Sequence, residues 1–181
     1  MNDSLPTGKP VKVHIRSEIT DLILAEMIAS AGEGQYLIDE ESGEQRLASE
    51  LAGEIENVIE YSTEGILTAD GNTVSVSYAE SEDMGFDDAR TTLSYDRKDP
   101  GVVTMIRTGS ASAVCRFDPA SPRQLCSFDT GILPIEVAMT LGSLKNRLTE
   151  DGGSILLDYT IEMRGVKTER TRFYIETEPL K

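Results

Sequence analysis

Few side chains in this sequence have the chemistry that a catalytic or metal site requires. The chain has one histidine, His14, and two cysteines, Cys115 and Cys126. Nucleophilic catalysis with a histidine base needs that base beside a serine or cysteine, and structural zinc needs four Cys or His ligands at short spacing. His14 shares the polar face of an alternating segment with Lys12 and Arg16, so we interpret it as an exposed strand residue. We therefore expect no catalytic residue, no bound metal and no cofactor.

The two cysteines are expected to be reduced thiols. A disulfide between Cys115 and Cys126 would need their Cβ atoms within about 4.5 Å, and a chain of this size can fold on one ordinary core without a cross-link. The N-terminal segment 1–10 is polar and lacks the apolar stretch of a secretory signal. These features predict a cytoplasmic protein.

Carboxylates are abundant, but their spacing does not predict a catalytic pair or a cation site. Five of them surround Met84-Gly85-Phe86, namely Glu80, Glu82, Asp83, Asp87 and Asp88, without the spacing of a calcium loop. We interpret them as solvated loop charge. Asp158 and Glu162 lie four residues apart on an alternating segment, which separates them by about 13 Å along a strand. That distance is too long for paired acid and base catalysis.

Two arginines in mostly apolar segments are candidate ligand-binding groups. Arg107 follows Val103 and Met105, and Arg116 follows Val114. A guanidinium among apolar neighbours must be paired or solvated, and at the mouth of a barrel it could offer two hydrogen bonds to an anionic ligand. The alternative is that each arginine points outward and neutralises an acidic surface.

The overall charge argues against two classes of partner. The chain carries 17 Lys and Arg against 32 Asp and Glu, a net charge of −15, and its sequence pI is about 4.4. Nucleic acids and anionic membranes are bound through Lys and Arg, so we expect neither as a partner. Residues 33–60 hold nine acidic residues against Arg46. The sequence leaves open whether the protein is a monomer or a homodimer.

Alternating apolar and polar residues predict that most of the chain forms β-strands. Val11, Val13 and Ile15, for example, alternate with Lys12 and His14. Asp70-Gly71-Asn72 and Arg164-Gly165 have the residue types of tight hairpin turns. Ten strands are predicted, at 11–20, 55–67, 72–80, 88–96, 102–108, 111–117, 123–128, 132–141, 153–163 and 166–176.

Consecutive antiparallel strands favour a closed all-β barrel, because closure removes exposed sheet edges. A two-sheet sandwich is the alternative that alternation cannot distinguish. Residues 10–178 are predicted to form this one domain, after a disordered leader at 1–9. An acidic insertion at 21–54 interrupts the pattern. Within it, 22–31 is predicted to be a helix, 34–38 a brief strand, and 45–51 a further helical turn or two.

The strand and turn motifs resemble a known family. Val11-x-Val13-x-Ile15, the segment GILTADGNTVSVSY at 65–78, MIRTG at 105–109 and GGSILLDYTI at 152–161 are similar to the uncharacterised bacterial YwiB-like family. That resemblance implies a small calycin-like barrel with the lipocalin architecture of about eight to ten strands. It covers about 11–20 and 55–177 and transfers no catalytic or binding residue.

Two functions remain as hypotheses, and enzymatic activity is not expected. The first is a non-enzymatic barrel that binds a small molecule in its interior or mouth. Its candidate lining residues are Tyr78, Tyr95, Met105, Arg107, Arg116 and Tyr159. The second is a structural or protein-interaction module that acts through its acidic surface, with the insertion as the contact region.

Overall fold

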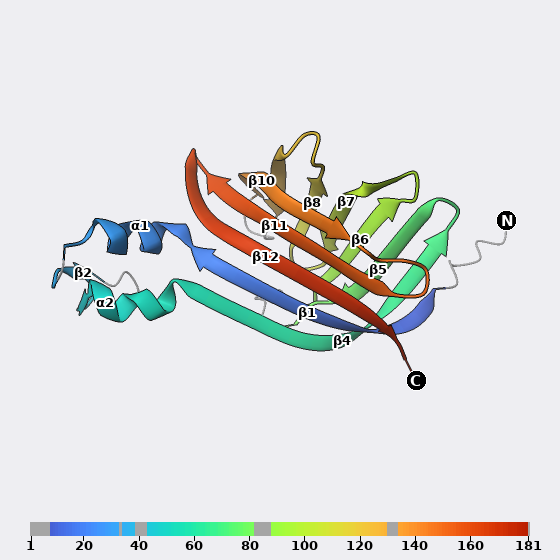
Figure 1. The fold of residues 1–181 in the computed structure, drawn as a ribbon, viewed down its shortest axis with the longest axis horizontal. Coiled ribbons are helices and arrows are strands. Elements are labelled where there is room, and N and C mark those ends of the chain that lie inside the picture. Colours follow the sequence, from blue (N-terminus) through green and yellow to red (C-terminus); the bar gives the residue numbers. More distant parts are fainter. Residues whose placement is uncertain (1–7, 33, 39–42, 82–87, 130–133, 181) are drawn as a thin grey trace.

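The chain forms one closed antiparallel barrel with a projecting insertion (Figure 1). The computed structural model describes residues 8–32, 34–38, 43–81, 88–129 and 134–180. The barrel strands are β1 Lys9–Asp21, β4 Glu56–Asp70, β5 Thr73–Ala79, β6 Arg90–Asp96, β7 Asp99–Thr108, β8 Ser112–Phe117, β9 Arg123–Asp129, β10 Pro134–Asn146, β11 Gly153–Met163 and β12 Val166–Pro179. The insertion contains α1 Leu22–Ser30, β2 Tyr36–Ile38, β3 Gln45–Leu47, α2 Ala48–Leu51 and a single 3-10 turn at Ala52–Glu54.

From β4 to β12, each barrel strand pairs with the next one along the chain, and β1 closes the ring. β1 lies between β4 and β12, with Val13 opposite Thr63 on one side and Thr177 on the other. The predicted all-β barrel is therefore confirmed, and closure of the ring rules out the sandwich. The two predicted hairpin turns have the required backbone: φ is +56° at Gly71, +51° at Arg164 and +83° at Gly165.

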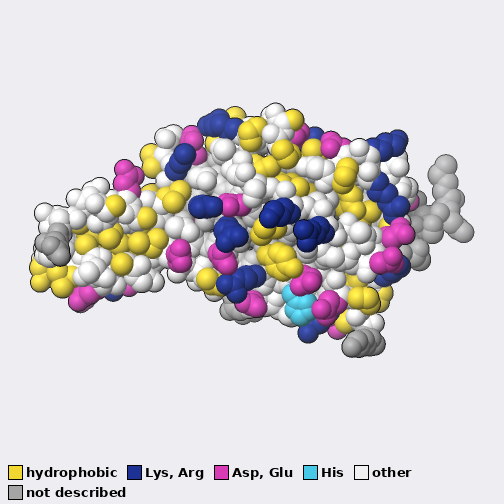
Figure 2. All heavy atoms as spheres, in the orientation of Figure 1, with side chains coloured by type: hydrophobic (Ala, Val, Ile, Leu, Met, Phe, Trp, Pro, Cys, Tyr) yellow, Lys and Arg dark blue, Asp and Glu magenta, His cyan; other side chains and the backbone are white. Residues whose placement is uncertain are grey.

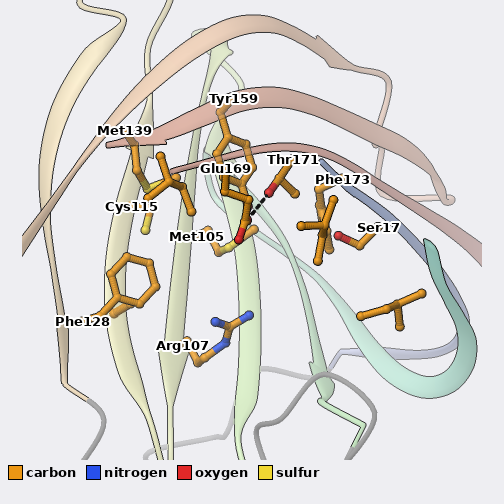
Figure 3. Close-up of a pocket in the computed structure, with 14 residues that line it drawn as sticks. Ser17, Met105, Arg107, Cys115, Phe128, Met139, Tyr159, Glu169, Thr171 and Phe173 are labelled. Atoms are coloured by element: carbon orange, nitrogen blue, oxygen red, sulfur yellow. Dashed lines mark hydrogen bonds between the residues drawn. The ribbon is translucent and has the colours of Figure 1, made fainter. Parts of the chain in front are cut away.

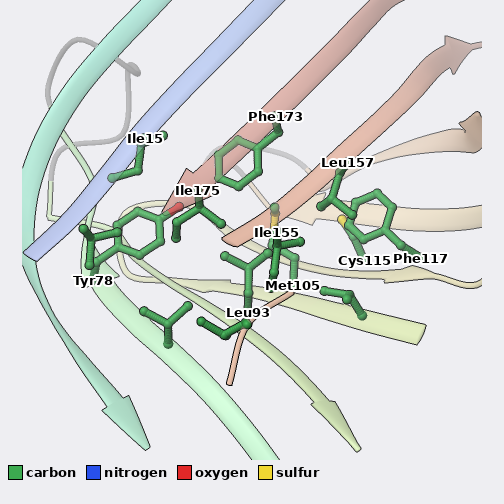
Figure 4. Packing of buried hydrophobic residues seen from close by; sticks show 14 of the residues in the cluster. Ile15, Tyr78, Leu93, Met105, Cys115, Phe117, Ile155, Leu157, Phe173 and Ile175 are labelled. Carbon is green, nitrogen blue, oxygen red and sulfur yellow. The ribbon is translucent and has the colours of Figure 1, made fainter. Parts of the chain in front are cut away.

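Period-two alternation places the larger apolar side chains inside the barrel. One end of the interior is filled by nine of them, which we call the packed half: Val13, Val74, Val76, Leu93, Val103, Phe117, Ile155, Leu157 and Ile175. None of them is more than 2% exposed. Figure 4 shows several of these side chains meeting near the barrel axis. Burial at this density provides the main stabilisation of the fold.

The seam between β8 and β9 has the shortest pairing in the barrel among the described residues. Only Ser112 with Asp129 and Ala113 with Phe128 are paired there. Continuing the same register places Cys115 opposite Cys126, and both are buried free cysteines. The barrel is thus closed with few backbone hydrogen bonds along this seam.

The insertion extends from one end of the barrel, where β1 ends and β4 begins (Figure 1). Asp21 caps α1 by accepting a hydrogen bond from the Leu24 amide, at 2.9 Å. No residue of α1 is buried. Ile23, Tyr36 and Ile38 are 43%, 62% and 62% exposed, and apolar side chains gather on this lobe in Figure 2. The insertion is therefore an arm with an apolar surface.

Several predicted boundaries need correction. Helix 22–31 is found at 22–30, but 45–47 forms β3, so the second helical segment is confined to 48–51 and the 3-10 turn. Residues 45–47 pair with β2, and this pairing outweighs a weak local helical preference. Lys9 belongs to β1 rather than to the leader, because it pairs with Leu67. The rest of the predicted leader, except Gly8, lies outside the described residues, as do the first two residues of the predicted strand 132–141.

Candidate functional site

The barrel interior contains a cavity of about 310 Å³ at the end from which the insertion projects (Figure 3). We call this end the hollow half. Apolar side chains form most of the wall: Ile19, Ile59, Met105, Ala113, Cys115, Phe128, Met139, Ile161 and Phe173. The polar lining side chains are those of Ser17, Arg107, Tyr159, Glu169 and Thr171. An apolar wall with few polar groups is typical of small-molecule sites, and the volume is near the lower limit for them.

Successive inward positions on the strands provide this lining. On β7, Met105 and Arg107 continue the inward face that begins in the packed half with Val103. On β12, Glu169, Thr171 and Phe173 do the same for the face that contains Ile175. The hollow half therefore uses the same alternation as the packed half. Smaller residues such as Ala113 and Ser17 leave part of its interior unfilled.

Arg107 is held at the wall of the cavity by a buried carboxylate. Its Nη2 atom lies 3.0 Å from Glu80 Oε1, and the two side chains are 12% and 1% exposed. The Thr91 hydroxyl also donates to Glu80, and Tyr61 donates to the other carboxylate oxygen at 2.9 Å. Glu80 therefore neutralises Arg107, and the hydroxyls satisfy the remaining acceptor capacity of the carboxylate.

Three buried or partly buried tyrosines near this cluster, Tyr61, Tyr78 and Tyr159, have raised pKa values. Burial, followed by the charge of Glu80, raises the pKa of Tyr61 and Tyr78 well above the usual value. Burial also raises the pKa of Tyr159. All three phenols are therefore neutral near pH 7. The Tyr78 hydroxyl is buried without a hydrogen-bond partner among the described residues.

Glu169 and Thr171 form the second polar group on the cavity wall. The Thr171 hydroxyl donates to Glu169 Oε1 at 2.6 Å, as the dashed line in Figure 3 shows. Unlike Glu80, Glu169 has no ion-pair partner within the part of the chain that the structure describes. Its charge and that of Arg107 both act on the Tyr159 hydroxyl. Glu169 is therefore a carboxylate on the cavity wall that forms no ion pair with any described side chain.

The thiol on the cavity wall is not suited to nucleophilic chemistry. A hydrogen bond with the Cys126 side chain, together with burial, raises the pKa of Cys115 far above that of an ordinary thiol. A protonated thiol is a poor nucleophile. Cys115 therefore contributes a small, polarisable apolar surface to the cavity.

Of the six candidate lining residues, three contact the cavity: Met105, Arg107 and Tyr159. Tyr78 is fully buried but does not line it. Tyr95 lies near the packed half, where its hydroxyl donates to the Leu148 carbonyl oxygen.

Arg116 does not lie in the barrel interior, because it points outward from β8. Its side chain is 52% exposed and pairs with Asp118 at 3.2 Å. On β8 the inward positions are Ala113, Cys115 and Phe117, so Val114 and Arg116 both point outward. Of the two arginines, Arg116 points outward into solvent, whereas Arg107 points into the cavity.

Sequence reasoning missed the two carboxylates of the site. Glu80 was expected to be solvated loop charge, yet its side chain is buried. Extending the alternation of Val74, Val76 and Tyr78 by two residues would have placed Glu80 on the inward face. On β12, the inward alternation of Ile175 and Phe173 continues through Thr171 to Glu169. The carboxylates at 82, 83 and 87 lie outside the described residues.

The other side chains considered from the sequence, His14, Asp158 and Glu162, lie on the outer face of the barrel. His14 lies outside the cavity, with Nδ1 2.7 Å from the Ser62 hydroxyl and Nε2 3.8 Å from Glu178. Asp158 pairs with Arg170, with Oδ2 2.7 Å from Nη2, while Glu162 pairs with Arg123. Across the described ranges, no group of three or more His, Cys, Asp or Glu side chains is arranged to hold a metal ion. Neither α1 nor any other described helix has the length and apolar character needed to cross a membrane.

Comparisons with known proteins identify the family. A crystal structure of the ywiB protein from Bacillus subtilis is similar over 96% of this chain and 93% of that chain, with a TM-score of 0.65 and 19% sequence identity. This similarity supports the fold alone. No curated protein matches the sequence. The family model described as a domain of unknown function, DUF1934, matches residues 45–175, which include all of β4 to β11 and most of β12. The chain therefore belongs to the DUF1934 family, as the YwiB-like resemblance implied.

Proposed function

We propose that this protein binds a small molecule in the hollow half of its barrel and does not transform it. The observation that carries the proposal is the cavity of about 310 Å³, whose wall is mostly apolar and includes two separate polar groups. Displacing water from such a wall favours an apolar ligand body, and the polar groups would orient it. The neutral thiol of Cys115 and the neutral phenol of Tyr159 favour binding over catalysis.

A matched pair of substitutions on β8 tests this proposal. Ala113 lines the cavity and is 7% exposed, whereas Val114 points outward and is 59% exposed. Ala113→Phe should fill part of the cavity, while Val114→Phe adds a ring of the same size outside it. We expect the uncharged fluorescent probe 1-aminonaphthalene to bind the wild type and Val114→Phe, and to bind Ala113→Phe at least about tenfold more weakly, a change worth about 1.4 kcal/mol.

Circular dichroism of both variants checks that the barrel has folded. If Ala113→Phe does not fold, Ile161→Phe provides a second cavity-filling variant, because Ile161 lines the same cavity. Equal binding of the probe to all folded variants, or no binding to the wild type, would contradict the proposal.

A second candidate function is protein interaction through the arm. It is favoured by α1, which buries none of its residues, and by the high exposure of Tyr36 and Ile38. Three exposed glutamates, Glu26, Glu50 and Glu54, accompany this apolar surface. The surface therefore suits a partner segment that is apolar and basic. A second copy is less suited, since each chain carries a net charge of −15.

Removal of the arm tests this second function. The Asp21 amide donates to the Ile55 carbonyl oxygen at 2.8 Å, so residues 22–54 can be replaced by an Asn-Gly turn that joins β1 to β4. A specific partner should form a complex of defined mass with the intact chain and not with the shortened one. Identical complexes with both chains, or self-association of the intact chain alone, would refute an arm that recruits a basic partner.

A further inference from the structure

The cavity has a formal charge that selects among ligands. Arg107 and Glu80 cancel each other, since they form a close ion pair with little exposure. Glu169 adds a negative charge that no described residue neutralises. Arg107, its partner Glu80 and Glu169 together carry a net charge of −1 when all three are ionised. This balance argues against the anion-binding role that the sequence suggested for Arg107.

Arg107 is also poorly available to an anion. Its Nη2 donates to Glu80 and its Nε lies 3.4 Å from the Thr91 hydroxyl oxygen. An anionic ligand would have to compete with a buried carboxylate for the guanidinium or tolerate its charge nearby. The overall charge of −15 adds a long-range field of the same sign.

The rest of the wall suits a cation attached to an apolar body. Phe128, Tyr159 and Phe173 present aromatic rings to the cavity (Figure 3). The faces of such rings attract an ammonium group. Thioether and thiol side chains, from Met105, Met139 and Cys115, add adaptable apolar contacts.

From this arrangement we propose that the cavity binds a small amine in its ammonium form, with Glu169 as the charged partner and the apolar wall around the hydrocarbon part. The proposal rests on the proposed function and specifies its ligand class. Thr171 fixes the Glu169 carboxylate through its hydroxyl at 2.6 Å, which leaves Oε2 for the ligand. Such a charge-assisted hydrogen bond is stronger than one between neutral groups.

Three probes of the same shape and different charge test the proposal: phenethylammonium, 2-phenylethanol and phenylacetate. Their affinities can be measured by titration with nuclear magnetic resonance detection at pH 7. We expect phenethylammonium to bind roughly 10- to 100-fold more tightly than phenylacetate, with 2-phenylethanol between them. Glu169→Gln should reduce the affinity for phenethylammonium to about that for 2-phenylethanol.

Glu176→Gln is the matched control, because Glu176 lies on the same strand with its side chain outside the barrel. It removes the same charge and should change each affinity by less than about twofold. Retained binding of 2-phenylethanol shows that Glu169→Gln keeps an intact cavity. If the Glu169→Gln variant no longer binds 2-phenylethanol, the Glu169→Asp variant is tested in its place. Glu169→Asp keeps the carboxylate and should therefore keep the preference for phenethylammonium.

The outcomes separate the two proposals. Binding of all three probes with equal affinity, or a preference for phenylacetate, would overturn the choice of an amine and leave a binding cavity. An unchanged preference in Glu169→Gln would overturn the role of Glu169. Binding of none of the probes at millimolar concentration would overturn both the ligand class and the proposed binding function.

Discussion

The packed half and the hollow half of the barrel are built by the same strands, yet their interiors differ. In the packed half, Leu93, Val103 and Leu157 are fully buried. In the hollow half, the next inward positions on β7 and β11 are Met105, Arg107 and Tyr159, and they surround a cavity of about 310 Å³. The comparison shows that alternation decides which side chains face inward, while their size and polarity decide whether the interior is solid.

The two halves are expected to divide stability and binding between them. Close packing in the packed half stabilises the fold. The hollow half contains an ion pair and an uncompensated carboxylate that apolar side chains could replace without loss of stability. Retaining polar groups at such a place is typical of a functional site. Three predictions test this division and a fourth concerns the outer face; they run from the largest expected effect to the smallest.

The largest effect is expected for Glu80→Ala, which would leave Arg107 without the carboxylate that neutralises it. Removing one partner of a buried ion pair lowers the free energy of unfolding by about 3–5 kcal/mol. Urea unfolding at pH 7 measures the change. Glu60→Ala is the control, because Glu60 pairs with Arg16 at the surface and is 66% exposed. A loss below about 1 kcal/mol for Glu80→Ala would show that Arg107 is solvated by the cavity and would weaken the contrast between the halves.

The second effect compares one truncation in each half. Leu93→Ala should lower the free energy of unfolding by about 2–5 kcal/mol, because it creates a void in a fully buried site. Ile161→Ala removes a half-buried side chain from a wall that already borders empty space, and should cost less than half as much. Both values come from urea unfolding curves with equal slopes. Similar losses of unfolding free energy for Leu93→Ala and Ile161→Ala would contradict the difference in packing between the two halves.

A smaller effect of opposite sign is expected at Tyr78, between the two halves. Its hydroxyl is buried and lacks a partner among the described residues. Tyr78→Phe removes this unsatisfied group and keeps the ring, so the free energy of unfolding should rise by about 1 kcal/mol. Thermal unfolding provides the measurement. A decrease of similar size would mean that the hydroxyl is hydrogen-bonded in solution and belongs to the polar network of the hollow half.

The smallest effect is expected on the outer face, at Asp158. A hydrogen bond from Arg170 lowers the pKa of Asp158 below its usual value near 3.8. A depressed folded-state pKa stabilises the fold above the unfolded-state pKa, and this stabilisation is lost as the pH falls through the folded-state value. Asp158→Asn should therefore cost up to about 1 kcal/mol at pH 7 and progressively less as the pH is lowered. Unfolding measured over a series of pH values from 7 downward tests this, and a loss that does not change with pH would point to packing instead of charge.

The sequence was sufficient to predict the ten barrel strands, most of their limits and the α1 helix, because side-chain period and turn residues are local properties. The sequence was not sufficient to predict whether individual residues near strand ends point into the barrel or into solvent. Arg107 and Arg116 have similar apolar neighbours, yet one faces the cavity and the other the solvent. A shift of one residue in the inward face of β8 accounts for the error at Arg116.

What the sequence determined by itself is the all-β barrel and its hairpin order, since alternation and turns act between neighbours along the chain. The tertiary structure decided where the barrel is hollow and how its interior is charged. Glu80 meets Arg107, and Glu169 reaches the same cavity, only after ring closure brings β5, β7 and β12 around one axis. Contacts between residues so distant in the chain depend on strand register and side-chain volume around the whole ring, which no local pattern specifies.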